Sequence, residues 1–311
     1  MLYADEPDRV FSAEGAWSVV KCSNATCGLL WLSPSPSDDE LSKAYANYYT
    51  HGPAGQSTIY RAVSIIYRLF VGALLLAFGI PVEQARLRRL YLKNGGGKSL
   101  LDVGCGDGEF LMRMKRRGWM PAGVDPDSAA IEIARGRLGS AVVCGDLSKI
   151  VELGRKFDVI AANHVIEHVR DPIEFLQLCG GLLREDGCVV LLTPNAKSYG
   201  HRTFGRYWRG LEVPRHLFVF NRNALAICAE RAGFVVDEMF TTSANAGGMF
   251  CASQVIAKYG RFDPKRQSRR EKLFEWLTRP FTALRARIRL MVDGDSGEEI
   301  YMTLKRRTLQ K

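Results

Sequence analysis

The sequence predicts an α/β protein with a mostly parallel sheet and helices on both of its faces. Short apolar runs of strand character alternate with segments of helical pattern between residues 99 and 192. The first run, Ser99–Val103, leads directly into a loop with glycine at alternate positions. Acids or polar residues follow the later runs. Because parallel strands bring their carboxyl ends to one edge, these residues are expected to meet in one crevice.

The glycine loop is Gly104-Cys105-Gly106-Asp107-Gly108, and it opens a helix. Glycine lets the backbone turn tightly, and a bare backbone at a helix N-terminus suits a ligand. The dinucleotide fingerprint requires a third glycine where this chain has Glu109, which disfavours an NAD-dependent oxidoreductase. A simple strand-to-helix turn remains the alternative interpretation of the loop.

The second expected strand, Ala122–Asp125, ends in an acid about 20 residues past the loop, a usual place for a carboxylate that binds ribose hydroxyls. Later strands are expected at 141–144, 157–162, 188–192, 234–242 and 298–305. A helix is expected from Asn221, as its N-cap, to Ala232.

Five runs in this order resemble class I S-adenosylmethionine (SAM)-dependent methyltransferases: LLDVGCGDGEFL, VDPDSAAIEIAR, GDL, FDVIAANHVIEHVRDP and LLREDGCVVLLTPN. The resemblance covers roughly residues 98–240 and implies a Rossmann-like sheet that ends in an antiparallel pair of strands. It also implies that the glycine loop meets the methionine part of SAM, that Asp125 holds the ribose and that Asp146 faces the adenine. The cofactor-binding residues implied are Asp102, Gly104, Gly106, Gly108, Asp125, Asp146, Leu147 and Asn163.

Methyl transfer from a sulfonium needs alignment and, for some acceptors, removal of a proton. Candidates for that chemistry are His164, Glu167, His168 and His216. We expect Glu167 and His168 to begin a helix, with His164 on the same face. A histidine could act as a general base, or Glu167 and His168 could only brace the helix.

A third interpretation comes from the resemblance. Ubiquinone-pathway O-methyltransferases and small-RNA 2′-O-methyltransferases have E-x-x-E-H here and bind a metal with it. In this chain the corresponding set would be Glu167, His168 and His216, but His164 replaces the first glutamate. A divalent metal is therefore doubtful as a cofactor, and no residue is assigned to one.

Residues 1–57 resemble the N-terminal region of a bacterial methyltransferase subgroup that carries a zinc ribbon. Here only Cys22 and Cys27 are present, with four residues between them instead of two, whereas a structural zinc needs about four ligands. We expect a degenerate ribbon without metal. Ser37 and Glu40 form a capping box for a helix that begins there.

Residues 58–97 are expected to form an apolar or amphipathic helical segment. Its uncharged part, Leu69–Ile80, is short for a bilayer span. It could cover the active site, lie in a membrane interface or span a membrane. A charged helix, Glu83–Lys93, is expected after it.

The methyltransferase domain itself is expected over residues 98–311. Tyr199–Phe220 is rich in arginine and aromatic residues, and we expect it to form a lid over the acceptor together with Ile59–Ile80. A basic helical insert is expected at about 250–295, broken or restarted at Pro280. This insert could lie on an anionic membrane or pack on its own domain.

The net charge of +10 indicates an acidic partner, and the eight scattered cysteines favour a reducing, cytosolic setting. A position at the membrane periphery is a further possibility. The predicted function is SAM-dependent O-methylation of a small-molecule or lipid- or glycan-linked acceptor. The alternatives are an RNA methyltransferase, which is disfavoured because no RNA-binding module is recognisable, and a catalytically silent SAM-binding protein.

Overall fold

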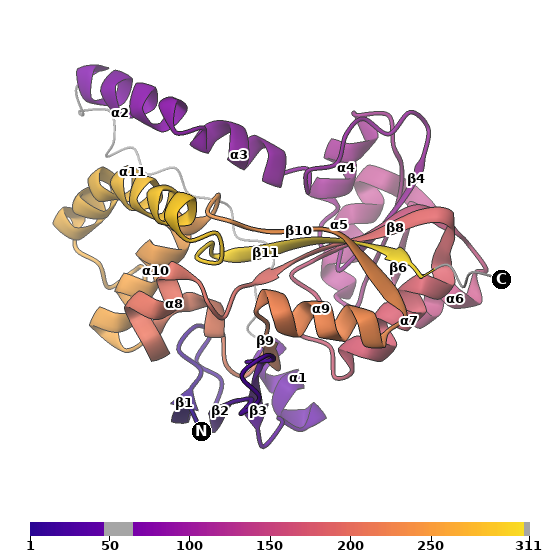
Figure 1. The fold of residues 1–311 in the computed structure, drawn as a ribbon, viewed down its shortest axis with the longest axis horizontal. Helices are drawn as coiled ribbons and strands as arrows, with labels where there is room; N and C mark the ends of the chain where they lie inside the picture. Colours follow the sequence, from indigo (N-terminus) through magenta and orange to yellow (C-terminus); the bar gives the residue numbers. More distant parts are fainter. Residues whose placement is uncertain (47–64, 308–311) are drawn as a thin grey trace.

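The computed structural model describes residues 1–46 and 65–307. Its central feature is a seven-stranded sheet in the order β10-β11-β8-β7-β4-β5-β6 (Figure 1). β4, β5, β6, β7 and β8 are parallel, whereas β11 is antiparallel to both β8 and β10. The predicted fold class is confirmed, including the final antiparallel pair. The strands are β4 (Ser99–Val103), β5 (Met120–Asp125), β6 (Val142–Cys144), β7 (Phe157–Asn163), β8 (Leu183–Pro194), β10 (Phe234–Thr242) and β11 (Glu299–Arg306).

Both faces of this sheet are covered because its strands are apolar on both sides. On one face, Leu101 and Ile160 pack against Leu176 and Leu225. On the other, Leu100 belongs to a cluster with side chains from α4 and from the end of α3. The covering helices are α4 (Glu109–Lys115), α5 (Ser128–Leu138), α6 (Leu147–Glu152), α7 (Pro172–Leu182) and α9 (Arg222–Arg231).

A second, four-stranded sheet joins the N-terminal region to the middle of the chain. It comprises β1 (Tyr3–Pro7), β2 (Ala16–Lys21), β3 (Leu30–Ser33) and β9 (Phe218–Val219), and α1 (Asp38–Ala46) follows β3. The capping box of Ser37 and Glu40 is confirmed at the start of α1. Trp17 and Leu32 of this sheet pack against Trp208 and Leu211.

The segment expected to form a lid, Tyr199–Phe220, is therefore largely an interior element that holds the N-terminal sheet. It contains α8 (Tyr199–Phe204) and the 3-10 turns η3 (Gly205–Tyr207) and η4 (Arg209–Leu211). The aromatic side chains that indicated a ligand-covering loop are used for packing instead: Trp208 is buried in the cluster with Trp17.

The remaining helices gather at one end of the molecule (Figure 1). α11 is continuous through Pro280, contrary to the predicted break. Proline removes one backbone hydrogen bond from the helix. The small residues Ala283 and Ala286 just beyond it are buried, and this packing keeps the following turns helical. These helices are α2 (Ile65–Ala77), α3 (Ile80–Leu87), α10 (Ala246–Tyr259) and α11 (Arg269–Val292).

The charged helix expected at Glu83–Lys93 corresponds to α3, which begins earlier, at Ile80, and ends earlier, at Leu87. Gly79, with φ +67°, separates α3 from α2, and Pro81 is accommodated in the first turn of α3. The predicted boundary at residues 57 and 58, and the part of the expected lid before Ile65, lie outside the described residues. Within the described ranges, no single helix has both the length and the composition to cross a membrane. Only the pair Leu69–Ala77 and Ile80–Leu87, bent by 71°, has them jointly.

Candidate functional site

The glycine loop joins β4 to α4 in a conformation that requires glycine. Gly104, Gly106 and Gly108 have φ values of +72°, +52° and +75°, in the left-handed region. A Cβ at Gly104 would lie 2.8 Å from Val165 Cγ2, whereas a Cβ at Gly106 would meet nothing within 4 Å. The Gly106 amide donates a hydrogen bond to Asp125 Oδ2 at 2.8 Å, which ties the loop to the end of β5.

The two acids predicted on β4 and β5 are both buried. Asp125 Oδ1 accepts from the Asp127 amide at 2.9 Å, so each of its oxygens holds one backbone N–H. A carboxylate oxygen has a second lone pair, and a ribose diol can therefore still be bound. Burial, and then the charge of Asp125, raise the pKa of Asp102 well above its usual value.

The third predicted acid is engaged in a helix cap. Asp146 accepts from the Ser148 amide at 2.9 Å as the N-cap of α6, and a hydrogen bond from the Ser148 hydroxyl lowers its pKa. The Leu147 side chain is buried in the core, so only its backbone is available to a ligand. Asn163 lies exposed at the end of β7.

A cavity of about 960 Å³ lies beside Asn163. Its walls come from α2, α3, α10 and α11, and its floor comes from the carboxyl ends of β7 and β8 and from the start of β11. Residues from 65–80, in the first half of the expected lid, line it, but none of its described lining residues comes from the second half, 199–220. Its apolar lining includes Val71, Leu75, Ile80, Phe110, Leu192, Met249 and Trp276.

His164 is the candidate histidine that lines this cavity. Its Nδ1 lies 3.0 Å from Glu167 Oε1, and its Nε2 lies 2.8 Å from Glu299 Oε1. Burial would lower the pKa of His164, but the hydrogen bonds and charges of both glutamates outweigh it and raise the pKa to about 10. At neutral pH His164 is therefore a cation that donates from both nitrogens, and it has no lone pair with which to accept a proton.

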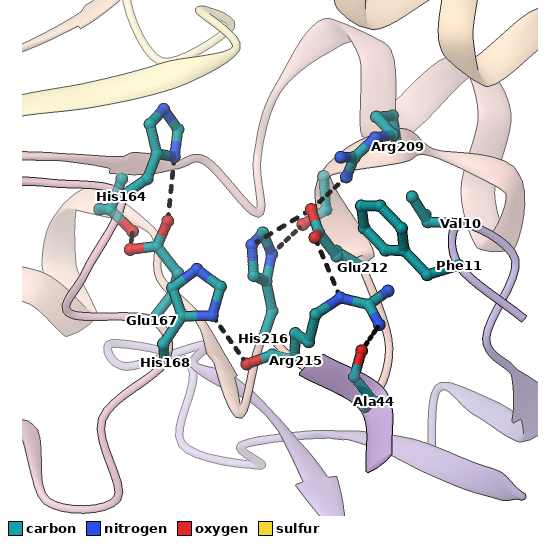
Figure 2. Close-up of polar contacts among 12 residues, drawn as sticks. Val10, Phe11, Ala44, His164, Glu167, His168, Arg209, Glu212, Arg215 and His216 are labelled. Carbon is teal, nitrogen blue, oxygen red and sulfur yellow. Dashed lines mark hydrogen bonds and ion pairs between the residues drawn. The ribbon is translucent and has the colours of Figure 1, made fainter. Parts of the chain in front are cut away.

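Glu167 contacts His164, and its carboxylate also lies near the other two histidines (Figure 2). It is fully buried, and its Oε2 accepts from the Thr193 hydroxyl at 3.0 Å. Burial alone would raise its pKa, but the hydrogen bond and charge of His164 lower it to about 2. Three possible ligand atoms lie within 4.8 Å of one another: one carboxylate oxygen of Glu167, one ring nitrogen of His168 and one ring nitrogen of His216.

The predicted helix at Glu167 and His168 is wrong. These residues lie in a turn, and the next helix, α7, begins at Pro172 after the N-cap Asp171. His164 has φ +55°, which no α-helix continues. Instead of sharing a helical face, His164 and His168 lie on either side of the Glu167 carboxylate (Figure 2).

Backbone carbonyls orient the other two histidines. His168 Nδ1 lies 3.0 Å from the Arg215 carbonyl, and His216 Nδ1 lies 2.8 Å from the Gly210 carbonyl. Each Nδ1 therefore carries a proton that it donates to the carbonyl, and Nε2 is the ring nitrogen that is left to face a ligand. Burial lowers the pKa of His216 to about 4, so His216 is neutral at physiological pH.

This donor set fits a divalent cation held by three protein ligands. One carboxylate and two neutral imidazoles are a common combination, and hydrogen bonds from the far ring nitrogens to backbone oxygens are typical of metal-binding histidines. The same geometry also suits a neutral histidine acting as a base. Cys22 and Cys27 do not belong to this cluster, because they lie around the turn that joins β2 to β3.

The sequence analysis did not predict two residues of the site. Glu299 and Asn245 line the cavity, and the Asn245 side-chain amide donates to both Glu299 oxygens at 3.0 Å. Two adjacent acids at the start of an otherwise apolar strand, Glu298 and Glu299, are the signal that could have indicated them.

A profile described as "Methyltransferase domain" matches residues 81–239, which is half of the chain. The chain belongs to this methyltransferase domain family. Membership implies SAM as the methyl donor of this methyltransferase. The matched range contains the glycine loop, Asp125, Asp146 and the turn that carries Glu167 and His168.

Curated relatives of the methyltransferase include two ubiquinone biosynthesis O-methyltransferases. The mitochondrial enzyme of Arabidopsis thaliana is 26% identical over 192 residues, and that of Pseudomonas paraeruginosa is 31% identical over 134 residues. The matches cover 55% and 40% of this chain and 58% of each relative, so the chain spans less than two thirds of their length. Among solved structures, a SAM-dependent methyltransferase from Archaeoglobus fulgidus aligns with 22% identity and a TM-score of 0.48, over 77% of this chain and 99% of that one.

Proposed function

We propose that the methyltransferase transfers the methyl group of SAM to a hydroxyl oxygen of a largely apolar small molecule or lipid-linked acceptor. The observation that carries this proposal is the cavity beside Asn163, because its lining includes Asn163 at the tip of β7 and Phe110 in the first turn of α4, the helix that the glycine loop opens. The named activity of the distant relatives, O-methylation in ubiquinone biosynthesis, supports oxygen as the accepting atom.

The shape and lining of the cavity support an acceptor of this class. A volume of about 960 Å³ is at the upper end for small-molecule sites. Apolar walls from α2 and α11 would exclude water and hold an apolar body. Polar groups converge at one end, where Asn163, His164 and Glu299 would orient the reacting hydroxyl.

The chain's own residues then have distinct roles. Asp125 and the glycine loop hold SAM, and alignment of its methyl group with the acceptor oxygen supplies most of the rate enhancement. His164, held as a cation between two carboxylates, positions Glu167 and Glu299. His216, which its lowered pKa keeps neutral, or His168 would receive the acceptor's proton.

A bound divalent cation is a second route to the same deprotonation. Glu167, His168 and His216 would hold it, and it would lower the pKa of an acceptor hydroxyl near it. The first glutamate of the E-x-x-E-H motif is His164 in this chain. Three protein ligands for a cation therefore remain, rather than four.

Filling the cavity tests the proposal. Gly72 lines the cavity, and a Cβ there would meet nothing within 4 Å, so the side chain of Gly72→Phe has room to leave the backbone and would occupy cavity volume. With methyl-labelled SAM and an extract of cells that produce the methyltransferase, we expect label in the solvent-extractable lipid and small-molecule fraction. Because the ring displaces the acceptor from its aligned position, we expect Gly72→Phe to reduce this labelling about 10²-fold.

The matched control is Gly136→Phe, on the exposed surface of α5, where a Cβ also meets nothing within 4 Å. It should label the extract at the parental rate, and both variants should bind SAM normally. Label in the RNA fraction, or a Gly72→Phe variant as active as the parent, would contradict the proposal.

A further inference from the structure

We propose that the outward faces of α2 and α11 seat the methyltransferase on an anionic membrane surface, from which a lipid acceptor enters the cavity. More than half of the exposed large hydrophobic side chains of the described residues lie on α2, α3 and α11. Single exposed apolar residues are ordinary, but such a concentration at one end of a molecule marks an interaction surface.

The outward stripe of α11 reverses the usual pattern of a surface helix. With 3.6 residues per turn, its large apolar residues fall within an arc of about 100°. Six of the eight stripe residues are solvent-exposed, among them Phe274 at 68%, Met291 at 71% and Val292 at 80%, and the other two are half-buried. The buried residues of α11 are the small Ala283 and Ala286, on the opposite side. The stripe consists of Leu273, Phe274, Leu277, Phe281, Leu284, Ile288, Met291 and Val292.

α2 is apolar on both its faces. Tyr67, Val71 and Leu75 line the cavity, whereas Leu69, Phe70 and Leu76 are more than 60% exposed. A helix that is apolar all round belongs in a protein core or in a membrane environment. The Tyr67 hydroxyl donates to the Leu277 carbonyl at 2.6 Å, so α2 and α11 lie side by side (Figure 1).

Arginines border the α11 stripe and determine which partner fits it. By helical position, Arg285 and Arg289 lie along one edge and Arg287 along the other. In the described part of the chain, none of the three forms an ion pair with a carboxylate. An apolar stripe bordered by cations matches an anionic leaflet, in which apolar side chains enter the acyl boundary and arginines reach the headgroups.

A second copy of the chain fits this surface less well, because pairing two such faces would bring arginines of the same charge together in a protein of net charge +10. The cavity supplies a further argument for lipid. Val71 of α2 and Trp276 and Pro280 of α11 line it, so the membrane-facing helices are also its walls. This inference rests on the proposed function only for the identity of the acceptor.

Co-sedimentation of the full chain with vesicles tests the surface without turnover. We expect binding to phosphatidylcholine vesicles that contain phosphatidylglycerol, weaker binding to phosphatidylcholine alone, and release by salt, which screens the arginines. Phe281→Glu combined with Ile288→Glu should abolish binding. Arg285→Gln should weaken it about fivefold, since each basic residue near an anionic surface contributes about 1 kcal/mol.

Ile133→Glu, at an equally exposed position of α5, is the matched control and should bind vesicles like the parent. SAM affinity of every variant checks folding and separates this proposal from the proposed function. The proposal is overturned if the parent stays in the supernatant at low salt, or if the double variant still sediments. It is also overturned if the parent is a dimer in solution that Phe281→Glu dissociates.

Discussion

Arg215→Met should reduce the free energy of unfolding by about 3–5 kcal/mol, because it breaks a buried ion pair and leaves its partners uncompensated. The Arg215 side chain is completely buried, 2.8 Å from Asp8 Oδ1 and 3.2 Å from Glu212 Oε1 (Figure 2 shows its contacts with Glu212 and Ala44). It thereby joins the N-terminal region, α1 and the 199–220 segment. Urea unfolding followed by tryptophan fluorescence measures the change.

Arg202→Met is the matched control. Arg202 forms an ion pair of the same length with Asp293, but both side chains are about half exposed, and such pairs contribute about 0–1 kcal/mol. Equal losses in the two variants would contradict the structural role of Arg215.

The Arg215 network also predicts the sign of a pH effect. Burial would raise the pKa of Asp8, but the hydrogen bond and charge of Arg215 lower it below its ordinary value. A carboxyl group whose pKa is lowered by folding stabilises the protein above about pH 4. This contribution is lost as the pH falls through the lowered pKa. The parent should therefore lose more stability on acidification than Arg215→Met does.

His216→Gln and His168→Gln should each lower turnover by about 10²–10⁴-fold while SAM affinity stays near that of the parent, because assistance with proton removal has this magnitude. Initial rates of S-adenosylhomocysteine formation with the unlabelled lipid and small-molecule extract as acceptor measure the effect. His201→Gln is the matched control. His201 is also buried and also bonded to a backbone carbonyl, that of Ala196, but it lies outside the Glu167 cluster.

Chelation separates the two routes to deprotonation. If a cation is held by Glu167, His168 and His216, EDTA abolishes activity and magnesium or zinc restores it; if a histidine is the base, EDTA has no effect. Parental turnover in both histidine variants would assign these residues a structural role.

The sheet was predictable because each strand is an apolar run bounded by glycine or a polar residue, and Ser99–Val103 agrees at both ends. The turn at Glu167, where a helix was predicted, was not predictable in this way. His164 adopts a left-handed backbone conformation, and its contact with Glu299 joins residues 135 positions apart in the sequence. Local helical pattern contains no information on such contacts.

The 199–220 segment failed as a prediction for a related reason. Its arginine and aromatic content suits a ligand-covering loop and equally suits an interface between two parts of one chain. Only the positions of Asp8 and Trp17, about 200 residues earlier, decide between them by pairing with Arg215 and packing with Trp208. The cofactor crevice depends on contacts within one strand–loop–strand unit, so the sequence indicated it more fully.

The most direct test of the account is calorimetry of SAM binding to the parent and to Asp125→Ala. Asp125 is expected to hold the ribose and to fix the loop through Gly106, so its loss should weaken SAM by about 1–3 kcal/mol. Asp237→Ala, on the exposed surface of β10, should leave the affinity unchanged. Parental affinity in Asp125→Ala, or no SAM binding by the parent chain, would contradict the assignment of this crevice as the methyl-donor site.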